Sequence, residues 1–269
     1  MAEQDRGWYV YCVVAAGERP LLEGQAGVHP ESEVGLVSDR RLSAVASTVP
    51  LEEFGAEALR KNLEDMAWLE RSARAHQAVL DRVLESTTAL VPMRLCTIFD
   101  DEQGVREMLA REGDVLLGSL ERVRDHSEWS VKVLADRAAV DAAVRARREA
   151  DAPEPGGTGA GHAYLARKRA ERSLRERSQE LVVAAAEEVH GRLSEEAEAA
   201  TLLPPQRKEL SGRSGEMVLN GAYLVHRSRV GAFKATAEEL GKARREIGLD
   251  LDLSGPWAPY NFVAAEQPA

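Results

Sequence analysis

Cysteine is scarce in this chain of 269 residues, which contains only Cys12 and Cys96. Both lie within apolar stretches typical of strands, and no C-x-x-C pair is present. The sequence therefore offers neither a disulfide framework nor a zinc-binding cysteine pattern. We expect two small buried thiols in a protein that stays in a reducing cytoplasm.

Long hydrophobic runs are also lacking. The longest, Trp8 to Ala16, has about half of the ~18 residues that a membrane-spanning helix requires. It does not fit the core of a signal peptide, because Glu3 and Asp5 outweigh Arg6 before it and its aromatic and β-branched residues favour a strand. We expect a soluble cytoplasmic protein with no membrane partner.

Motifs that mark common enzymes are missing. No P-loop, zincin or α/β-hydrolase string occurs, and the glycines at 157–161 lack both the preceding strand and the spacing of a dinucleotide-binding loop. The six histidines are spread singly, without the close spacing that metal sites use on one element. The sequence therefore predicts no catalytic residue, no cofactor and no metal site.

His76 is the histidine with the most distinctive position, because it falls on the apolar face of a predicted helix. One interpretation is a hydrogen-bonded histidine of the core. The other is a general base or a ligand.

Acidic residues outnumber basic ones: 45 Asp and Glu stand against 35 Lys and Arg, a formal net charge of −10. A negative field repels phosphate backbones, so general nucleic-acid binding is excluded. With 44% hydrophobic residues the chain has enough apolar material for a sizeable core. Its length predicts two compact domains, and one domain with a long insertion is the alternative.

The N-terminal half predicts an α+β domain over residues 1–126. From Leu59 to Ser86 apolar residues recur every three or four positions, a spacing that places them on one face of a helix. Pro92 restricts the start of the next strand to an edge or a bend. The expected elements are strands at 8–15, 34–38 and 42–48, a helix at 59–86, a strand at 88–99 and a helix at about 101–124.

The C-terminal half, residues 127–269, has the element order β-α-β-β-α-β, which is typical of a ferredoxin-like domain, here modified by long helices. Residues 151–161 are rich in proline and glycine and predict a flexible loop. The expected elements are a strand at 128–134, a helix to Ala150, a long helix at 162–200, strands at 201–204 and 216–226, a helix at 231–247 and a strand at 249–254.

The long helix at 162–200 is basic in its first half and acidic in its second, an order that opposes the helix dipole. One interpretation is a solvated face. The other is an antiparallel helix, from another protein or a second copy of this chain, that meets each half with opposite charge. On this second interpretation the partner-binding residues are Arg167, Arg172, Glu187 and Glu195.

The C-terminal stretch from Gly255 to Phe262 combines two prolines with three aromatic residues. The prolines stiffen the stretch, so that it loses little entropy on docking. Trp257, Tyr260 and Phe262 are therefore candidate partner-binding residues, since Trp and Tyr often dominate interfaces. The alternative is that the stretch folds back as core over the edge of the last strand.

Several short segments with distinctive residues are spread over nearly the whole chain. They are Trp8–Val14, Trp68-Leu69 with His76, Val91–Arg94, Thr97–Phe99, Glu128–Val133, Gly221–Val225 and the ending Leu253–Val263. In order and spacing they resemble the gas vesicle protein L/F family, and the terminal G-P-W-x-P-Y-x-F is the most distinctive of them.

The resemblance implies an accessory or minor structural protein of gas vesicles, the gas-filled, protein-shelled compartments that give some prokaryotes buoyancy. Such a protein would help assembly in the cytoplasm and at the vesicle by contacting the small hydrophobic shell protein and other accessory proteins. It would have no enzymatic activity and no cofactor, and self-association is compatible with it. The alternatives are a ferredoxin-like sensor of small ligands and an enzyme.

Overall fold

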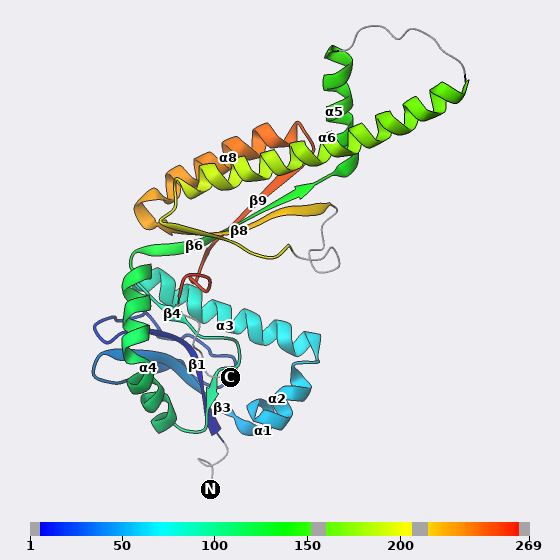
Figure 1. Ribbon diagram of the computed structural model, residues 1–269. Helices are drawn as coiled ribbons and strands as arrows, with labels where there is room; N and C mark the ends of the chain where they lie inside the picture. Colours follow the sequence, from blue (N-terminus) through cyan, green and yellow to red (C-terminus); the bar gives the residue numbers. More distant parts are fainter. Residues whose placement is uncertain (1–5, 152–159, 206–214, 264–269) are drawn as a thin grey trace. The chain divides into compact units, whose positions relative to one another are not determined.

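The computed structural model describes residues 6–151, 160–205 and 215–263 (Figure 1). The chain is an α+β protein with two antiparallel sheets, and it divides into two compact units. Unit 1 comprises Met1–Glu128 and Pro256–Ala269, and unit 2 comprises Trp129–Gly255. The sequence prediction grouped all of 127–269 together, whereas the structure assigns the residues from Pro256 onward to unit 1.

Unit 1 is built around β1 (Arg6–Ala15), which pairs with β3 (Leu42–Pro50) on one side and with β4 (Val91–Pro92) and β5 (Ile98–Phe99) on the other. The side chains of Tyr9–Val14 are all fully buried, because α3 and α4 both contact this strand. The elements are β1 (Arg6–Ala15), β2 (Gly35–Ser38), β3 (Leu42–Pro50), α1 (Leu51–Phe54), α2 (Ala56–Asn62), α3 (Met66–Ser86), β4 (Val91–Pro92), β5 (Ile98–Phe99) and α4 (Glu102–Val123).

Residues 56–86 form α2 and α3, so the single helix predicted over 59–86 is wrong. Asp65 causes the break, because its carboxylate accepts hydrogen bonds from the backbone nitrogens of Ala67 at 2.9 Å and Trp68 at 3.3 Å. A side chain that caps an N-terminus starts a new helix. The apolar spacing runs across the break and therefore does not reveal it.

The continuous strand predicted at 88–99 is also wrong, because only its two ends, β4 and β5, are paired. Between them the chain turns: the Thr97 nitrogen donates to the Arg94 carbonyl at 3.2 Å, and Cys96 has a φ of 65°. Such a positive φ interrupts an extended strand.

Unit 2 has a sheet with the strand order β7 (Ala199–Leu202), β8 (Glu216–His226), β6 (His126–Ala135), β9 (Leu249–Trp257). The helices α6 (Ala160–Ser194) and α8 (Val230–Arg245) lie along the same face of this sheet (Figure 1). Buried apolar residues of both helices, such as Val189 and Phe233, form one core with Val131 of β6. The elements are β6 (His126–Ala135), α5 (Arg137–Asp151), α6 (Ala160–Ser194), β7 (Ala199–Leu202), β8 (Glu216–His226), the 3-10 turn η1 (Arg227–Arg229), α8 (Val230–Arg245) and β9 (Leu249–Trp257).

The long helix ends at Ser194, so its predicted extent to residue 200 is wrong. The Glu198 nitrogen donates to the Leu224 carbonyl of β8 at 2.8 Å, which joins this stretch of chain to the sheet. β7 therefore forms over 199–202 instead of the predicted 201–204. The predicted loop at 151–161 falls mainly on residues 152–159, which lie outside the described residues.

The C-terminal stretch leaves unit 2 at Gly255, whose φ of 137° lies in the region that glycine alone adopts readily. Pro256 follows and fixes its own φ. Of the described residues beyond it, Ala258 and Phe262 are buried, and Ala258 packs in the core of unit 1. A helix long and apolar enough to cross a membrane is not found within the described parts of the chain.

Candidate functional site

The first set of predicted site residues lies in the C-terminal segment, defined here as Pro256–Val263, within unit 1. Its side chains divide between core and surface. Ala258 and Phe262 are buried, and Ala258 packs in the core cluster of the unit 1 sheet. Trp257 is 38% exposed and Tyr260 is 40% exposed. Of the three predicted aromatic residues, two therefore reach the surface, while Phe262 serves as an anchor.

A buried carboxylate holds this segment in place. Glu128 is 5% exposed, and its two carboxylate oxygens accept hydrogen bonds from Asn261, at 2.9 Å from the backbone nitrogen and at 2.6 Å from the side-chain amide. Burial raises the pKa of Glu128, and the two hydrogen bonds from Asn261 partly oppose this rise. One residue therefore satisfies both oxygens of a carboxylate that would otherwise be costly to bury.

A chain of hydrogen bonds fixes the second contact of the segment, through His76. The Tyr9 hydroxyl lies 2.9 Å from His76 Nδ1, and the Tyr260 hydroxyl lies 3.1 Å from His76 Nε2. The Cys96 nitrogen donates to the Tyr9 hydroxyl at 3.0 Å, and the Tyr260 hydroxyl donates to the Met93 carbonyl at 3.3 Å. Because the Tyr260 hydroxyl donates its proton to Met93, it accepts a hydrogen bond from Nε2 of His76. We therefore assign the proton of the neutral imidazole to Nε2.

Burial determines the chemistry of this chain of hydrogen bonds. His76 is 3% exposed, and burial lowers its pKa to about 4. Burial also raises the pKa of Tyr9 and of Tyr260, so neither phenol ionises near neutral pH. The hydrogen-bonded core histidine expected as one interpretation of the sequence is confirmed. The arrangement positions the C-terminal segment and leaves no poised base.

Tyr11 continues the same core with a second polar cluster. Its hydroxyl lies 2.8 Å from Ser47 Oγ and accepts a hydrogen bond from the Val28 nitrogen at 2.8 Å. A Cβ at Gly27 would lie 2.6 Å from this hydroxyl, so only glycine allows the close approach. The sequence shows Tyr9 and Tyr11 at the alternating spacing of a strand, but their polar partners come from distant residues.

The second set of predicted site residues lies on α6 and directly after it, in unit 2. Arg167 pairs with Glu171 at 3.2 Å and Arg172 pairs with Glu176 at 2.9 Å, both one turn along the same exposed helix. Such exposed pairs contribute little to stability. The side chains of the other two predicted residues are also exposed; Glu187 lies on this helix, and Glu195 directly follows its last residue, Ser194.

The acidic half of α6 already has an antiparallel partner helix within the chain. Among the described residues, three ion pairs join α6, or the turn that follows it, to α8 or to the residue before α8. Their order shows that the two helices run antiparallel, because residues further along α6 pair with residues nearer the start of α8. The pairs are Glu188–Arg244, Arg192–Glu239 at 3.9 Å and Glu196–Arg229 at 2.9 Å. Helix α8 therefore supplies part of the charge complementarity that the sequence suggested for a separate partner.

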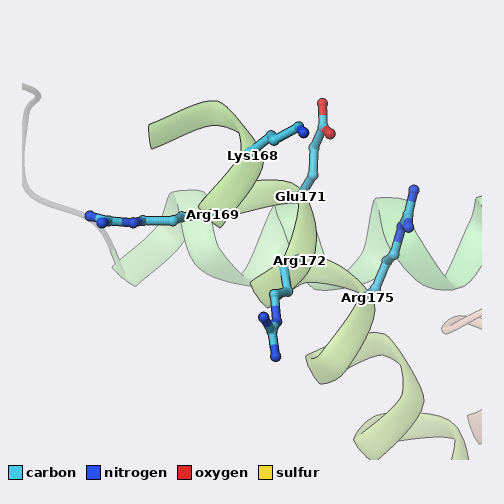
Figure 2. A pocket seen from close by; sticks show the side chains of 5 residues that line it. All are labelled: Lys168, Arg169, Glu171, Arg172 and Arg175. Atoms are coloured by element: carbon cyan, nitrogen blue, oxygen red, sulfur yellow. The ribbon is translucent and has the colours of Figure 1, made fainter. Parts of the chain in front are cut away.

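The basic half of α6 borders a shallow hollow, lined among the described residues by Lys168, Arg169, Glu171, Arg172 and Arg175. Figure 2 shows that these side chains point in different directions and share no common centre. A hollow without converging polar groups is a poor site for a small ligand.

The described residues contain neither a cluster of metal ligands nor a reactive thiol. No group of three or more His, Cys, Asp or Glu side chains there could hold a metal ion. Cys12 and Cys96 are free thiols, and burial raises the pKa of Cys96 to about 11. A thiol that stays protonated at neutral pH is a weak nucleophile.

Comparison with known proteins identifies relatives over the full length. The family described as gas vesicle synthesis protein GvpL/GvpF matches residues 7–264. Gas vesicle protein L of Streptomyces sp. (strain CB03234) is 37% identical over 259 residues, which cover 96% of this chain and 93% of that protein. Gas vesicle protein F of the same strain is 27% identical over 95% of this chain and 98% of its own length.

Solved structures show the same fold. The crystal structure of the gas vesicle protein GvpF from Anabaena sp. PCC7120 has a TM-score of 0.71 at 16% identity, covering 97% of this chain and 98% of that one. The GvpF structure from Microcystis aeruginosa has a TM-score of 0.65 at 19% identity, covering 95% and 98%. The family match spans nearly all of the described residues, and this chain therefore belongs to the GvpL/GvpF family of gas vesicle synthesis proteins.

Proposed function

We propose that this protein is an accessory or minor structural protein that helps gas vesicles to assemble by contacting the small shell protein and other vesicle proteins. The observation that carries the proposal is the family match over residues 7–264. The family is a gas vesicle structural family whose members are not known as enzymes. We extend this to the chain itself, which on our proposal acts by binding, in the cytoplasm and at the vesicle.

The C-terminal segment is the contact surface that we propose for the shell protein. Trp257 and Tyr260 are each exposed by more than a third. The buried Ala258 holds the backbone between them, and Asn261 and Phe262 hold it after Tyr260. A pair of aromatic residues on a fixed backbone loses little conformational entropy on binding. Such residues contribute strongly to interfaces, which supports a role for this segment.

The solvent-facing side of α6, together with the residue Glu195 that directly follows it, is the second contact surface that we propose. Glu187 and Glu195 remain exposed beside the acidic residues that pair with α8, and Arg167 and Arg172 are exposed in the basic half. Their charges would steer a helix of another vesicle protein, or of a second copy, into antiparallel register.

For unit 2 we propose the ferredoxin-like arrangement, with α5 as an addition. The strand order β7-β8-β6-β9 supports this, since it places the first and third strands of the unit at the centre of the sheet. The position of α6 and α8 on one face of the sheet supports it as well (Figure 1).

The experiment uses a gas-vesicle-producing host from which the gene for this protein is deleted. Wild-type protein restores vesicles, whereas Trp257→Ala restores few and captures less shell protein in a pull-down. Because Trp257 is 38% exposed, the variant should lose no more than about 2 kcal/mol of stability, less than a fully buried Trp would.

Met66→Ala is the matched control, since Met66 is an exposed apolar side chain of the same unit at 72% exposure. It should leave vesicle number and shell-protein capture unchanged. A host without this protein that still makes normal vesicles would contradict the proposed function. If Trp257→Ala captures as much shell protein as the wild type does, the C-terminal segment is not the contact surface for the shell protein.

A further inference from the structure

Positive charge is concentrated in one part of this acidic chain. Residues 137–177 contain ten Arg and Lys against six Asp and Glu, a net charge of +4. Since the whole chain carries −10, the remainder carries −14. Within residues 137–177 the basic groups occur in two runs, one late in α5 and one early in α6.

The fold brings these two runs onto one helical hairpin. Helix α5 packs beside α6 (Figure 2), and Val144 of α5 and Leu174 of α6 are both buried. Ser178 Oγ donates to the Asp141 carboxylate at 2.6 Å, which ties the two helices together. The side chains on the outside of the hairpin are exposed, and we call five of them the basic hairpin surface: Arg145, Arg147, Arg169, Arg175 and Arg177.

None of these five arginines forms an ion pair with another residue of the described part of the chain. The carboxylates of Glu171 and Glu176 pair with Arg167 and Arg172, and none of the ion pairs among the described residues includes a member of the basic hairpin surface. Like charges on neighbouring helices repel each other. The acidic half of α6 differs, because α8 supplies basic partners to it.

We propose that the basic hairpin surface binds an acidic polypeptide segment of another vesicle protein. The proposal rests on the proposed function, and it adds the place and the charge of one partner. An extended segment rich in Asp and Glu that crosses the hairpin would reduce the repulsion among these arginines and form ion pairs with side chains of both helices.

Two other polyanions fit the surface less well. A nucleic acid would be repelled by Glu171 and Glu176, which lie among the arginines, and by the remainder of the chain, which carries a net charge of −14. Residues 137–147 and 167–177 also contain no aromatic side chain on which bases could stack. A helix that lies in a lipid surface carries an exposed apolar face beside its charges. The exposed large apolar residues of the described chain include none within 137–147 or 167–177.

The test measures binding of the full-length protein to a fluorescent peptide of Glu-Ala repeats by anisotropy. Reversing three charges in R169E/R175E/R177E should weaken binding about tenfold, as expected for the loss of several exposed ion pairs. Binding of the wild-type protein should fall away as salt rises to about 0.5 M. The neutral variant R169Q/R175Q/R177Q should lie between wild type and the reversed form.

The matched control is R60E/K61E/R71E, which makes the same change in net charge at exposed residues of unit 1. It should bind the peptide like the wild type. Equal weakening by both variants, or no binding of the peptide by the wild type, would overturn the proposal. Tighter binding of a single-stranded DNA oligonucleotide or of phosphatidylserine vesicles than of the peptide would also overturn it.

Complementation of the deletion host separates this proposal from the proposed function. If wild-type protein restores vesicles and R169E/R175E/R177E restores them equally well, the basic hairpin surface has no role and the proposed function stands. If wild-type protein has no effect on vesicles, the proposed function fails whatever the peptide measurement gives. Restoration by the wild type and the R60E/K61E/R71E control, but not by the hairpin variant, supports both.

Discussion

Each unit places a tyrosine against a histidine, and the two pairs differ in how completely they are enclosed. In unit 1, Tyr9 and His76 are 0% and 3% exposed, and both ring nitrogens of His76 have hydrogen-bond partners. In unit 2, the fully buried Tyr223 lies with its hydroxyl 3.0 Å from Nδ1 of His190, whose side chain is only partly buried.

The difference indicates that the two units are held together in different ways. In unit 1, the Tyr9–His76–Tyr260 chain of hydrogen bonds joins a strand, a helix and the C-terminal segment, so one polar network specifies how three distant segments pack. In unit 2, the core is mainly aliphatic, and the polar pair reaches the surface of the unit through the partly buried His190. Breaking the polar pair should therefore cost more in unit 1 than in unit 2.

The largest effect should appear in the pH dependence of stability. His76 has a pKa of about 4 in the folded protein against 6.5 for an ordinary histidine, so between these values the unfolded chain binds more protons. Stability should then rise with pH through this window, by at most about 3 kcal/mol from this residue. Denaturant unfolding of the wild type and His76→Gln between pH 4 and 7 measures the difference.

Subtracting the two proteins isolates His76, because the other titrating groups, including Glu128 with its raised pKa, are present in both. The difference in unfolding free energy between wild type and His76→Gln should grow as pH rises from 4 to 6.5. The same pH dependence in both proteins would show that His76 is not held neutral by the fold.

The next effect compares the two tyrosines directly. Tyr9→Phe should lower the unfolding free energy by about 2 kcal/mol, because it leaves His76 Nδ1 and the Cys96 N–H without a buried partner. Tyr223→Phe should cost about 1 kcal/mol, because the partly buried His190 can turn to water. Urea unfolding at pH 7 tests both, and equal losses would contradict the proposed difference between the units.

The smallest effect concerns the charge pairs between α6 and α8. Glu188→Gln should cost about 0.5 kcal/mol, since the Glu188 side chain is 48% exposed and its partner Arg244 is 20% exposed. Glu187→Gln, which removes an exposed charge one residue away, is the control and should be neutral. A loss above about 2 kcal/mol at Glu188 would make this ion pair part of the unit 2 core instead.

The site features that the sequence revealed are those formed by neighbouring residues. The aromatic and proline residues of 255–262 and the charge reversal along 162–200 are visible in the sequence itself. The partners of these features were not visible. Glu128 meets Asn261 across 133 positions of sequence, and His76 meets Tyr260 across 184. No short-range pattern encodes such pairs.

By itself, the sequence determined the alternation of strands and helices. The strand β8 matches its prediction at 216–226, because a run of apolar residues between polar residues gives the length of a strand directly. It also determined the family, whose distinctive segments lie in order along the chain. Only the tertiary structure decided where α3 starts, where α6 ends, and that the C-terminal segment packs in unit 1. These outcomes depend on a capping side chain, on pairing with β8 and on the buried Glu128, and each is a contact whose energy exceeds the local preference of the chain.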